Sequence, residues 1–150
     1  LWILDMAAQH GLHLLIDVPW VKRHCFLDNE KRRNAARTAV REAASACAGH
    51  PAVFAFSVVN EIPPDVARWH GHEKIAEFID ELIADVKSIS PDCLCTFANF
   101  PPTEYLRAAS VDFVCFNVYL HQQKSFEGYL ARLQMLADTK PLLKIGRAHV

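Results

Sequence analysis

Glycine is scarce in this 150-residue sequence, and the short motifs that depend on glycine are missing. Its five glycines form neither the G-x-G-x-x-G turn that approaches a dinucleotide pyrophosphate nor the G-x-x-x-x-G-K-[ST] loop that surrounds nucleotide phosphates. The G-x-S-x-G turn that exposes a nucleophilic serine is missing as well. The sequence therefore lacks the short signatures of dinucleotide binding, nucleotide hydrolysis and serine esterase chemistry.

Long apolar runs and a surplus of charge of one sign are also missing. No apolar run approaches the roughly 20 residues that a membrane-spanning helix requires. The formal net charge of -1 lacks the basic surplus with which proteins neutralise nucleic-acid phosphates. We therefore expect neither a membrane segment nor a nucleic-acid partner. Hydrophobic residues make up 51% of the chain and charged residues 22%, which indicates a globular protein with a packed core.

The five cysteines are an odd number and form no C-x-x-C pair. This pattern disfavours a disulfide-stapled secreted fold, and it gives the location a lean towards the cytoplasm while leaving it open. Cys93 and Cys95 are two residues apart, which places both thiols on the same face of a strand. A metal or redox pair is one interpretation of them. Buried reduced thiols are the favoured one, because free cysteine packs as a small hydrophobe.

Strand-like and helix-like stretches alternate along the chain. Apolar runs predict strands, and apolar residues at helical spacing predict helices. Asp28 is the predicted N-cap of the first long helix, and residues 49–51 (GHP) end that helix. The predicted strands cover residues 12–18, 52–59, 93–98 and 112–120, with another starting at 141–143. The predicted helices cover residues 28–48, 66–89 and 126–137, with one more at the start of the chain.

These strands are continuously apolar rather than alternating, which indicates burial on both faces and is typical of a parallel sheet covered by helices. The fold class is therefore α/β. Two architectures fit it: an open doubly wound sheet, or an arc of a (β/α)8 TIM barrel. Since a whole barrel takes about 250 residues, this chain would supply a partial TIM barrel of five of eight parallel strands.

The last six residues stand apart from the rest. Residues 145–150 can be read back into the codons ATC GGA AGA GCA CAC GTC, which resemble a widely used sequencing adapter. We therefore expect residues 1–144 to form the barrel domain and residues 145–150 to be read-through.

Polar and aromatic residues gather where the predicted strands end, which is where α/β folds place their functional groups. A carboxylate that transfers protons, amides that bond hydroxyl groups and rings that stack on pyranoses together suit sugar recognition. His70 and His72 lack the i, i+4 spacing of a zinc site, so we expect no metal and no other cofactor. The candidate site residues are Asp17, Trp20, Asn60, Glu61, Asn99, Asn117 and Tyr119.

Three of these segments resemble glycoside hydrolases of clan A. Residues 49–53 (GHPAV), followed by a strand that ends in Asn60-Glu61, resemble the fourth strand of that clan. Residues 116–119 (FNVY) resemble its sixth strand, and residues 141–143 (PLL) resemble the start of its seventh. The likeness covers nearly all of residues 1–144, as strands three to seven. It is closest to catalytic barrels related to family 2, which occur fused to bacterial glycosyltransferases.

The resemblance implies a retaining glycoside hydrolase or transglycosylase that acts on a β-linked glycan. As the general acid/base, Glu61 would protonate the leaving oxygen and then activate water. Asn60 would bond the sugar 2-hydroxyl, and Tyr119 would orient the nucleophile. The sequence departs from the clan's pattern after Leu143, because no glutamate follows. The nucleophile is therefore missing, and we expect the fragment alone to be inactive.

Other interpretations stay open at this point. The same residues fit a catalytically silent, carbohydrate-binding barrel attached to a glycosyltransferase, or an open α/β sheet that binds another small ligand. A structural hydrogen bond is the favoured explanation of Asp17, and Asn117 is divided between a structural and a functional role. Trp20 and Trp69 either stack on sugar rings or pack against a loop.

Overall fold

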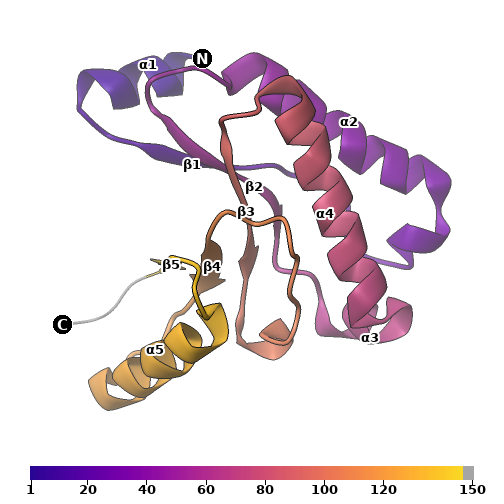
Figure 1. Ribbon diagram of the computed structural model, residues 1–150, viewed down its shortest axis with the longest axis vertical. Coiled ribbons are helices and arrows are strands. Elements are labelled where there is room, and N and C mark those ends of the chain that lie inside the picture. The colour runs from indigo at the N-terminus through magenta and orange to yellow at the C-terminus, as the bar shows by residue number, and fades with distance from the viewer. Residues whose placement is uncertain (147–150) are drawn as a thin grey trace.

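A computed structural model describes residues 1–146 as a curved sheet with its helices on the outside (Figure 1). The strands are β1 (Leu14–Asp17), β2 (Val53–Asn60), β3 (Leu94–Asn99), β4 (Val114–Asn117) and β5 (Leu142–Ile145). The helices are α1 (Trp2–Gln9), α2 (Glu30–Cys47), α3 (Pro64–His70), α4 (His72–Ile89) and α5 (Gln123–Ala137), with short 3-10 turns η1 (Phe26–Asp28) and η2 (Pro101–Thr103). None of these helices is long and apolar enough to cross a membrane.

The five strands lie in the order β1-β2-β3-β4-β5, and every neighbouring pair is parallel. An open doubly wound sheet reverses its strand order at a switch point, and this sheet does not. Sequential parallel order with helices between the strands is the pattern of a (β/α)8 barrel. The prediction of a partial TIM barrel is therefore confirmed, and the open sheet is excluded.

Three predicted boundaries were wrong for local reasons. The helix predicted over residues 66–89 is two helices, because Gly71 at φ 86° breaks it between α3 and α4. Asn29 rather than Asp28 is the N-cap of α2, and its side chain accepts a hydrogen bond from the Arg32 backbone N–H. The strand predicted over residues 112–120 shrinks to β4.

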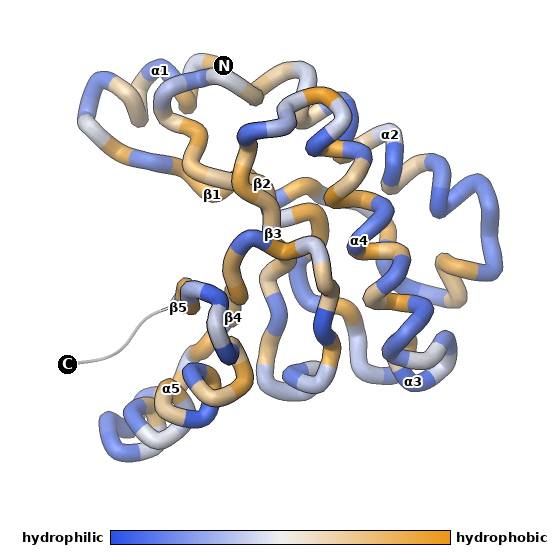
Figure 2. The backbone as a smooth tube through the Cα atoms, viewed as in Figure 1, coloured by the Kyte–Doolittle hydropathy of each residue, from blue (hydrophilic) through white to orange (hydrophobic). Residues whose placement is uncertain are grey.

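The main core lies between the sheet and the pair α2 and α4, which pack side by side (Figure 1). A smaller cluster under α5 is built from Phe116, Val118 and Leu133. In Figure 2 the central strands are mostly hydrophobic, and the hydrophilic residues lie on the helices around them. Helices α2 and α4 therefore hold β1–β3 firmly, and α5 alone covers β4 and β5.

The end of β5 overlaps the segment predicted to be read-through. Ile145 pairs with Asn117, and its carbonyl accepts a hydrogen bond from the Val118 N–H at 2.9 Å. Residues 147–150 lie outside the described part of the chain. The adapter origin of residues 145–150 stays a prediction.

Candidate active site

A hollow of about 390 Å³ lies among the five strands, on the face of the sheet that the helices do not cover. Alternate side chains line it, because successive residues of a strand point to opposite faces. In β1, for example, Leu15 and Asp17 line the hollow while Ile16 packs against the helix-side core. Every strand contributes: the lining residues are Leu15, Asp17, Ser57, Asn60, Ala98, Asn117, Tyr119, Leu143 and Ile145.

A β-bulge near the end of β2 determines which residues face the hollow. Ser57 pairs with Thr96 and Asn60 pairs with Ala98, so three steps along β2 match two steps along β3. Such an extra residue bends a strand and re-aims the side chains that follow it. Without the bulge, strict alternation from Ser57 would turn Asn60 towards the helices.

Asn60, Glu61 and Asn117 meet at the edge of this hollow. The Asn117 side-chain amide donates hydrogen bonds of 2.7 Å to Asn60 Oδ1 and of 2.7 Å to Glu61 Oε1. Glu61 has a φ of 51°, in the left-handed region that residues other than glycine rarely adopt. This backbone turn lets two consecutive side chains reach one amide group. Strain of this kind clusters at functional sites.

Asp17 brings a second carboxylate to the hollow, and Lys22 brings a positive charge. Loss of water around the Asp17 carboxyl raises its pKa, although the neighbouring Ser57 hydroxyl and the charge of Lys22 oppose that rise. Partial burial lowers the pKa of the Lys22 ammonium against the attraction of Asp17 and Glu61. The site therefore has two acidic groups and one basic group within electrostatic range of one another.

Tyr119 also lines the hollow, and its side chain is 60% exposed. Its ring lies against Gly146, where a Cβ atom would come within 3.0 Å of Tyr119 Cε1 and 2.5 Å of the Val118 carbonyl oxygen. Only glycine fits that approach, and its φ of 114° also favours glycine. The chain that leaves β5 therefore passes directly beside Tyr119.

Trp20 and Asn99 are not among the residues that line this hollow. The Trp20 indole donates to the Val58 carbonyl at 2.8 Å and packs edge-on against Phe26 and Phe78. The Asn99 side chain is buried, accepts from the Phe100 N–H and donates to the Thr103 carbonyl at 2.9 Å. These contacts favour structural roles for both, and their binding to substrate stays a prediction.

Sequence reasoning missed two residues of the site, Ser57 and Lys22. Ser57 does leave a signal, since it is the single polar residue in the apolar run 52–59. A lone hydroxyl in a buried strand needs a hydrogen-bonding partner, which makes it worth examining. Lys22 leaves no signal, because it lies in the irregular segment after β1.

Cys93 and Cys95, which are two residues apart, are both free thiols. Burial raises the pKa of the Cys95 thiol to about 12, so that thiol is neutral and unreactive near neutral pH. Across residues 1–146, no group of three or more His, Cys, Asp or Glu side chains has an arrangement that could hold a metal ion.

Comparison with known proteins identifies solved structures of similar fold. A scan against protein-family models and a search of curated proteins find no match. A β-glucuronidase from Ruminococcus gnavus in complex with D-glucuronic acid superposes with a TM-score of 0.72 and 18% identity over 93% of this chain. A putative β-galactosidase from Bacteroides fragilis superposes with a TM-score of 0.69 and 16% identity over 94%. The fold is glycosidase-like.

This chain spans only part of these structures, namely 25% of the glucuronidase chain and 20% of the galactosidase chain. Sequence identities below one fifth establish a shared fold and leave the activity to the side chains of each protein.

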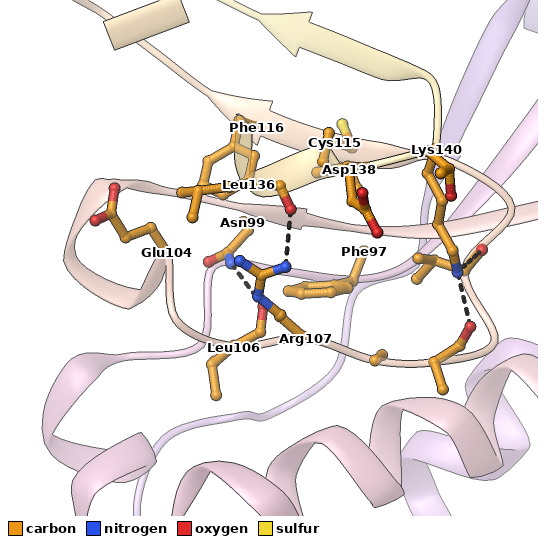
Figure 3. Close-up of a pocket in the computed structure, with 16 residues that line it drawn as sticks. Phe97, Asn99, Glu104, Leu106, Arg107, Cys115, Phe116, Leu136, Asp138 and Lys140 are labelled. Carbon is orange, nitrogen blue, oxygen red and sulfur yellow. Dashed lines mark hydrogen bonds between the residues drawn. The ribbon is translucent and has the colours of Figure 1, made fainter. Parts of the chain in front are cut away.

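A second hollow, of about 270 Å³, lies on the helix side of the sheet and does not include Glu61 (Figure 3). It separates the main core from the cluster under α5. Arg107 donates to the Leu136 carbonyl at 2.9 Å across it, and Lys140 donates to the carbonyls of Ala109 and Val111 at 2.7 Å each. The connector 100–113 contains only the short turn η2 where a regular βα unit has a helix, which explains the space.

Proposed function

We propose that this chain is part of the barrel of a retaining glycoside hydrolase or transglycosylase that acts on a β-linked glycan, with Glu61 as general acid/base. The observation that carries the proposal is the Asn117 amide, which fixes Asn60 and Glu61 side by side at the strand ends. The glycosidase-like fold supports it, because (β/α)8 enzymes place their catalytic residues at these ends.

The geometry gives each side chain a distinct task. Asn117 occupies Glu61 Oε1, so Oε2 is the oxygen that gives a proton to the glycosidic oxygen and later takes one from water. Asn60 accepts from Asn117 through Oδ1, which turns its own N–H groups to a sugar hydroxyl. Hydrogen bonds to the 2-hydroxyl strengthen as the sugar approaches its oxocarbenium-like transition state.

A retaining mechanism needs a nucleophilic carboxylate about 5–5.5 Å from the acid/base. In this proposal a glutamate that follows β5 in the completed sequence supplies it, because β5 leads to the hollow that Tyr119 also lines. The Tyr119 hydroxyl then orients the nucleophile. Asp17 stays a substrate-binding group, with its charge balanced by Lys22.

The test begins with the source DNA on both sides of this coding segment, followed by expression of the completed protein. Glu61→Gln should lower kcat on β-glycosides with poor leaving groups by about 10²–10⁴-fold, because those groups need protonation. Dinitrophenyl β-glycosides, whose leaving group needs no proton, should lose much less in the glycosylation step. Glu73→Gln, at an exposed position in the first turn of α4, is the matched control and should leave kcat unchanged.

Two outcomes would contradict the mechanism: no glutamate shortly after β5 in the completed sequence, or unchanged turnover in Glu61→Gln. Binding of glycans by the completed protein without hydrolysis or transfer would indicate the alternative function, a catalytically silent, carbohydrate-binding barrel attached to a glycosyltransferase. Assays with a β-glucuronide and a β-galactoside side by side would give the first information on the sugar.

A further inference from the structure

The bulge in β2 interrupts the register between β2 and β3. Both Val58 and Val59 pack into the helix-side core, which two consecutive residues of a regular strand would not do. Regular pairing resumes at Asn60, which pairs with Ala98. A bulge inside a buried sheet is stable only when the backbone groups beside it keep hydrogen-bond partners.

The Ser57 hydroxyl bonds both strands at the bulge. Ser57 Oγ accepts the Ala98 N–H at 3.2 Å and donates to the Val59 carbonyl at 3.1 Å. Ser57 is 0% exposed, so both bonds are buried. One side chain therefore closes the bulge from inside.

Ala98 links this hydroxyl to Glu61. The Ala98 N–H is bound by Ser57, and the Ala98 carbonyl accepts the Glu61 N–H at 2.8 Å. Ser57 therefore holds the N–H of Ala98, and the carbonyl of the same residue holds the strained backbone of Glu61. In this arrangement the side chains of Asn60 and Glu61 both meet Asn117.

We infer that Ser57 is a positioning residue, whose hydroxyl closes the β2 bulge and so holds Asn60 and Glu61 against the Asn117 amide. Its meaning for catalysis rests on the proposed function, whereas its effect on geometry does not. Ser57 touches neither Asn117 nor the reacting atoms, so it acts through the backbone of Ala98 and Glu61.

The test compares Ser57→Ala, Ser57→Thr and Thr96→Val in the 150-residue chain. Thr96→Val is the matched control, because Thr96 is equally buried and its hydroxyl donates to the Phe113 carbonyl at 2.7 Å rather than bonding Ala98 or Val59. The measurements are the NMR signals of the Asn117 side-chain amide and the Glu61 backbone amide, their hydrogen exchange, and denaturant unfolding.

In Ser57→Ala we expect the Asn117 amide protons to lose the downfield shift caused by the carboxylate, and the Glu61 amide to exchange about tenfold faster. Ser57→Thr keeps the hydroxyl and should restore both signals. Thr96→Val should lower stability by a similar amount and leave both signals in place. A general loosening of the fold would move the signals in both variants alike.

Unchanged Asn117 and Glu61 signals in Ser57→Ala, or equal changes in Thr96→Val, would overturn the inference. If Ser57→Ala does not fold, Ser57→Cys carries the same measurement, since a thiol forms weaker bonds to the same two groups. Failure of both to fold beside a folded Thr96→Val would also overturn it, because the hydroxyl would then determine the fold. None of these measurements depends on glycoside turnover, so this inference and the proposed function can fail separately.

Discussion

The two sides of the arc differ in how well helices cover their strands. On one side α2 and α4 cover β1–β3 with a single large core, and a buried carboxylate locks the two helices together. On the other side α5 covers β4 and β5 with a small cluster, and the connector before β4 has no helix. The second hollow, of about 270 Å³, lies at the seam, which is the boundary between these two sides beside the connector that has no helix (Figure 3).

This contrast shows which part of a βα unit supplies its stability. β4 and β5 pair over four positions, as β1 and β2 do, so the pairing of these strands does not separate the two sides. The helices do, because they supply the large apolar layer on one side and only a small one on the other. The residues that bridge the seam are polar and mostly surface-lying, such as Glu104 with Tyr129 and Arg132. Exposed ion pairs of this kind contribute little. We therefore expect the α5 side to open before the rest.

The largest expected effect comes from truncating the two cores. Leu82 in α4 and Leu133 in α5 are both 0% exposed. Leu82→Ala should lower the free energy of unfolding by about 4 kcal/mol, because the surrounding core cannot collapse onto the cavity. Leu133→Ala should lower the free energy of unfolding by about 2 kcal/mol, because its smaller cluster can collapse further onto the cavity.

Urea unfolding measures the change in the free energy of unfolding for both variants. Hydrogen exchange shows which parts of the protein lose protection. Protection should fall throughout the protein in Leu82→Ala and only in α5 and β5 in Leu133→Ala. Equal losses of protection everywhere would mean that the two sides form one cooperative unit.

The next effect concerns the lock between α2 and α4. The Asp85 carboxylate accepts hydrogen bonds from Arg37 Nε at 2.7 Å and Arg41 Nη2 at 2.5 Å, and its side chain is 5% exposed. Asp85→Asn should lower the free energy of unfolding by about 2 kcal/mol at pH 7. Glu81→Gln is the control, because Glu81 is half-exposed and lies 3.7 Å from Arg37, so it should cost close to nothing.

The same lock predicts a pH dependence. Burial alone would raise the pKa of Asp85, but the hydrogen bonds and charges of Arg37 and Arg41 outweigh burial and lower it. The unfolded carboxyl titrates near pH 4, so the stabilisation is complete above that pH and is lost as the pH falls below it. Denaturant unfolding at pH 7 and pH 3 should therefore show wild type and Asp85→Asn converging in acid. A constant difference between them would contradict this account.

The smallest effect comes from filling the seam. Ala108 lines the outer hollow and is 6% exposed, so Ala108→Leu should add apolar contact there and raise the free energy of unfolding by about 1 kcal/mol. Ala36→Leu, in the packed face of α2 at 0% exposure, should lower it by about 2 kcal/mol through overpacking. Thermal unfolding of both variants measures the two signs. Destabilisation by both would show that the seam is as tightly packed as the core.

Much of the fold follows from local pattern. The apolar runs at residues 52–59 and 93–98 are strands within a residue or two of their predicted ends, because runs of that kind suit strands that are buried on both faces. The errors have local causes that pattern alone does not weigh. Gly71 sits between two segments with continuous helical spacing, and only its positive φ shows that the chain turns there.

The sequence likewise predicts some residues of the candidate site correctly and misplaces others. Asn60, Glu61 and Asn117 were expected at strand ends, and the structure brings the three into hydrogen-bonding contact. Asn99 was expected there on the same reasoning, and its amide is engaged with the loop after β3 instead. A strand-end residue can face either side of the sheet, and its face depends on register, which the sequence of one strand does not encode.

The sequence by itself determined the α/β class, the order of the elements and the polar groups at the strand ends, because hydrophobic periodicity and turn residues are local properties. The tertiary structure alone decided the side-by-side order of the parallel strands, the hollow at the seam, and the β2 bulge that turns Asn60 towards Asn117. Each of these depends on hydrogen bonds and packing between residues far apart in the chain, as in the bond of 3.2 Å between Ala98 and Ser57.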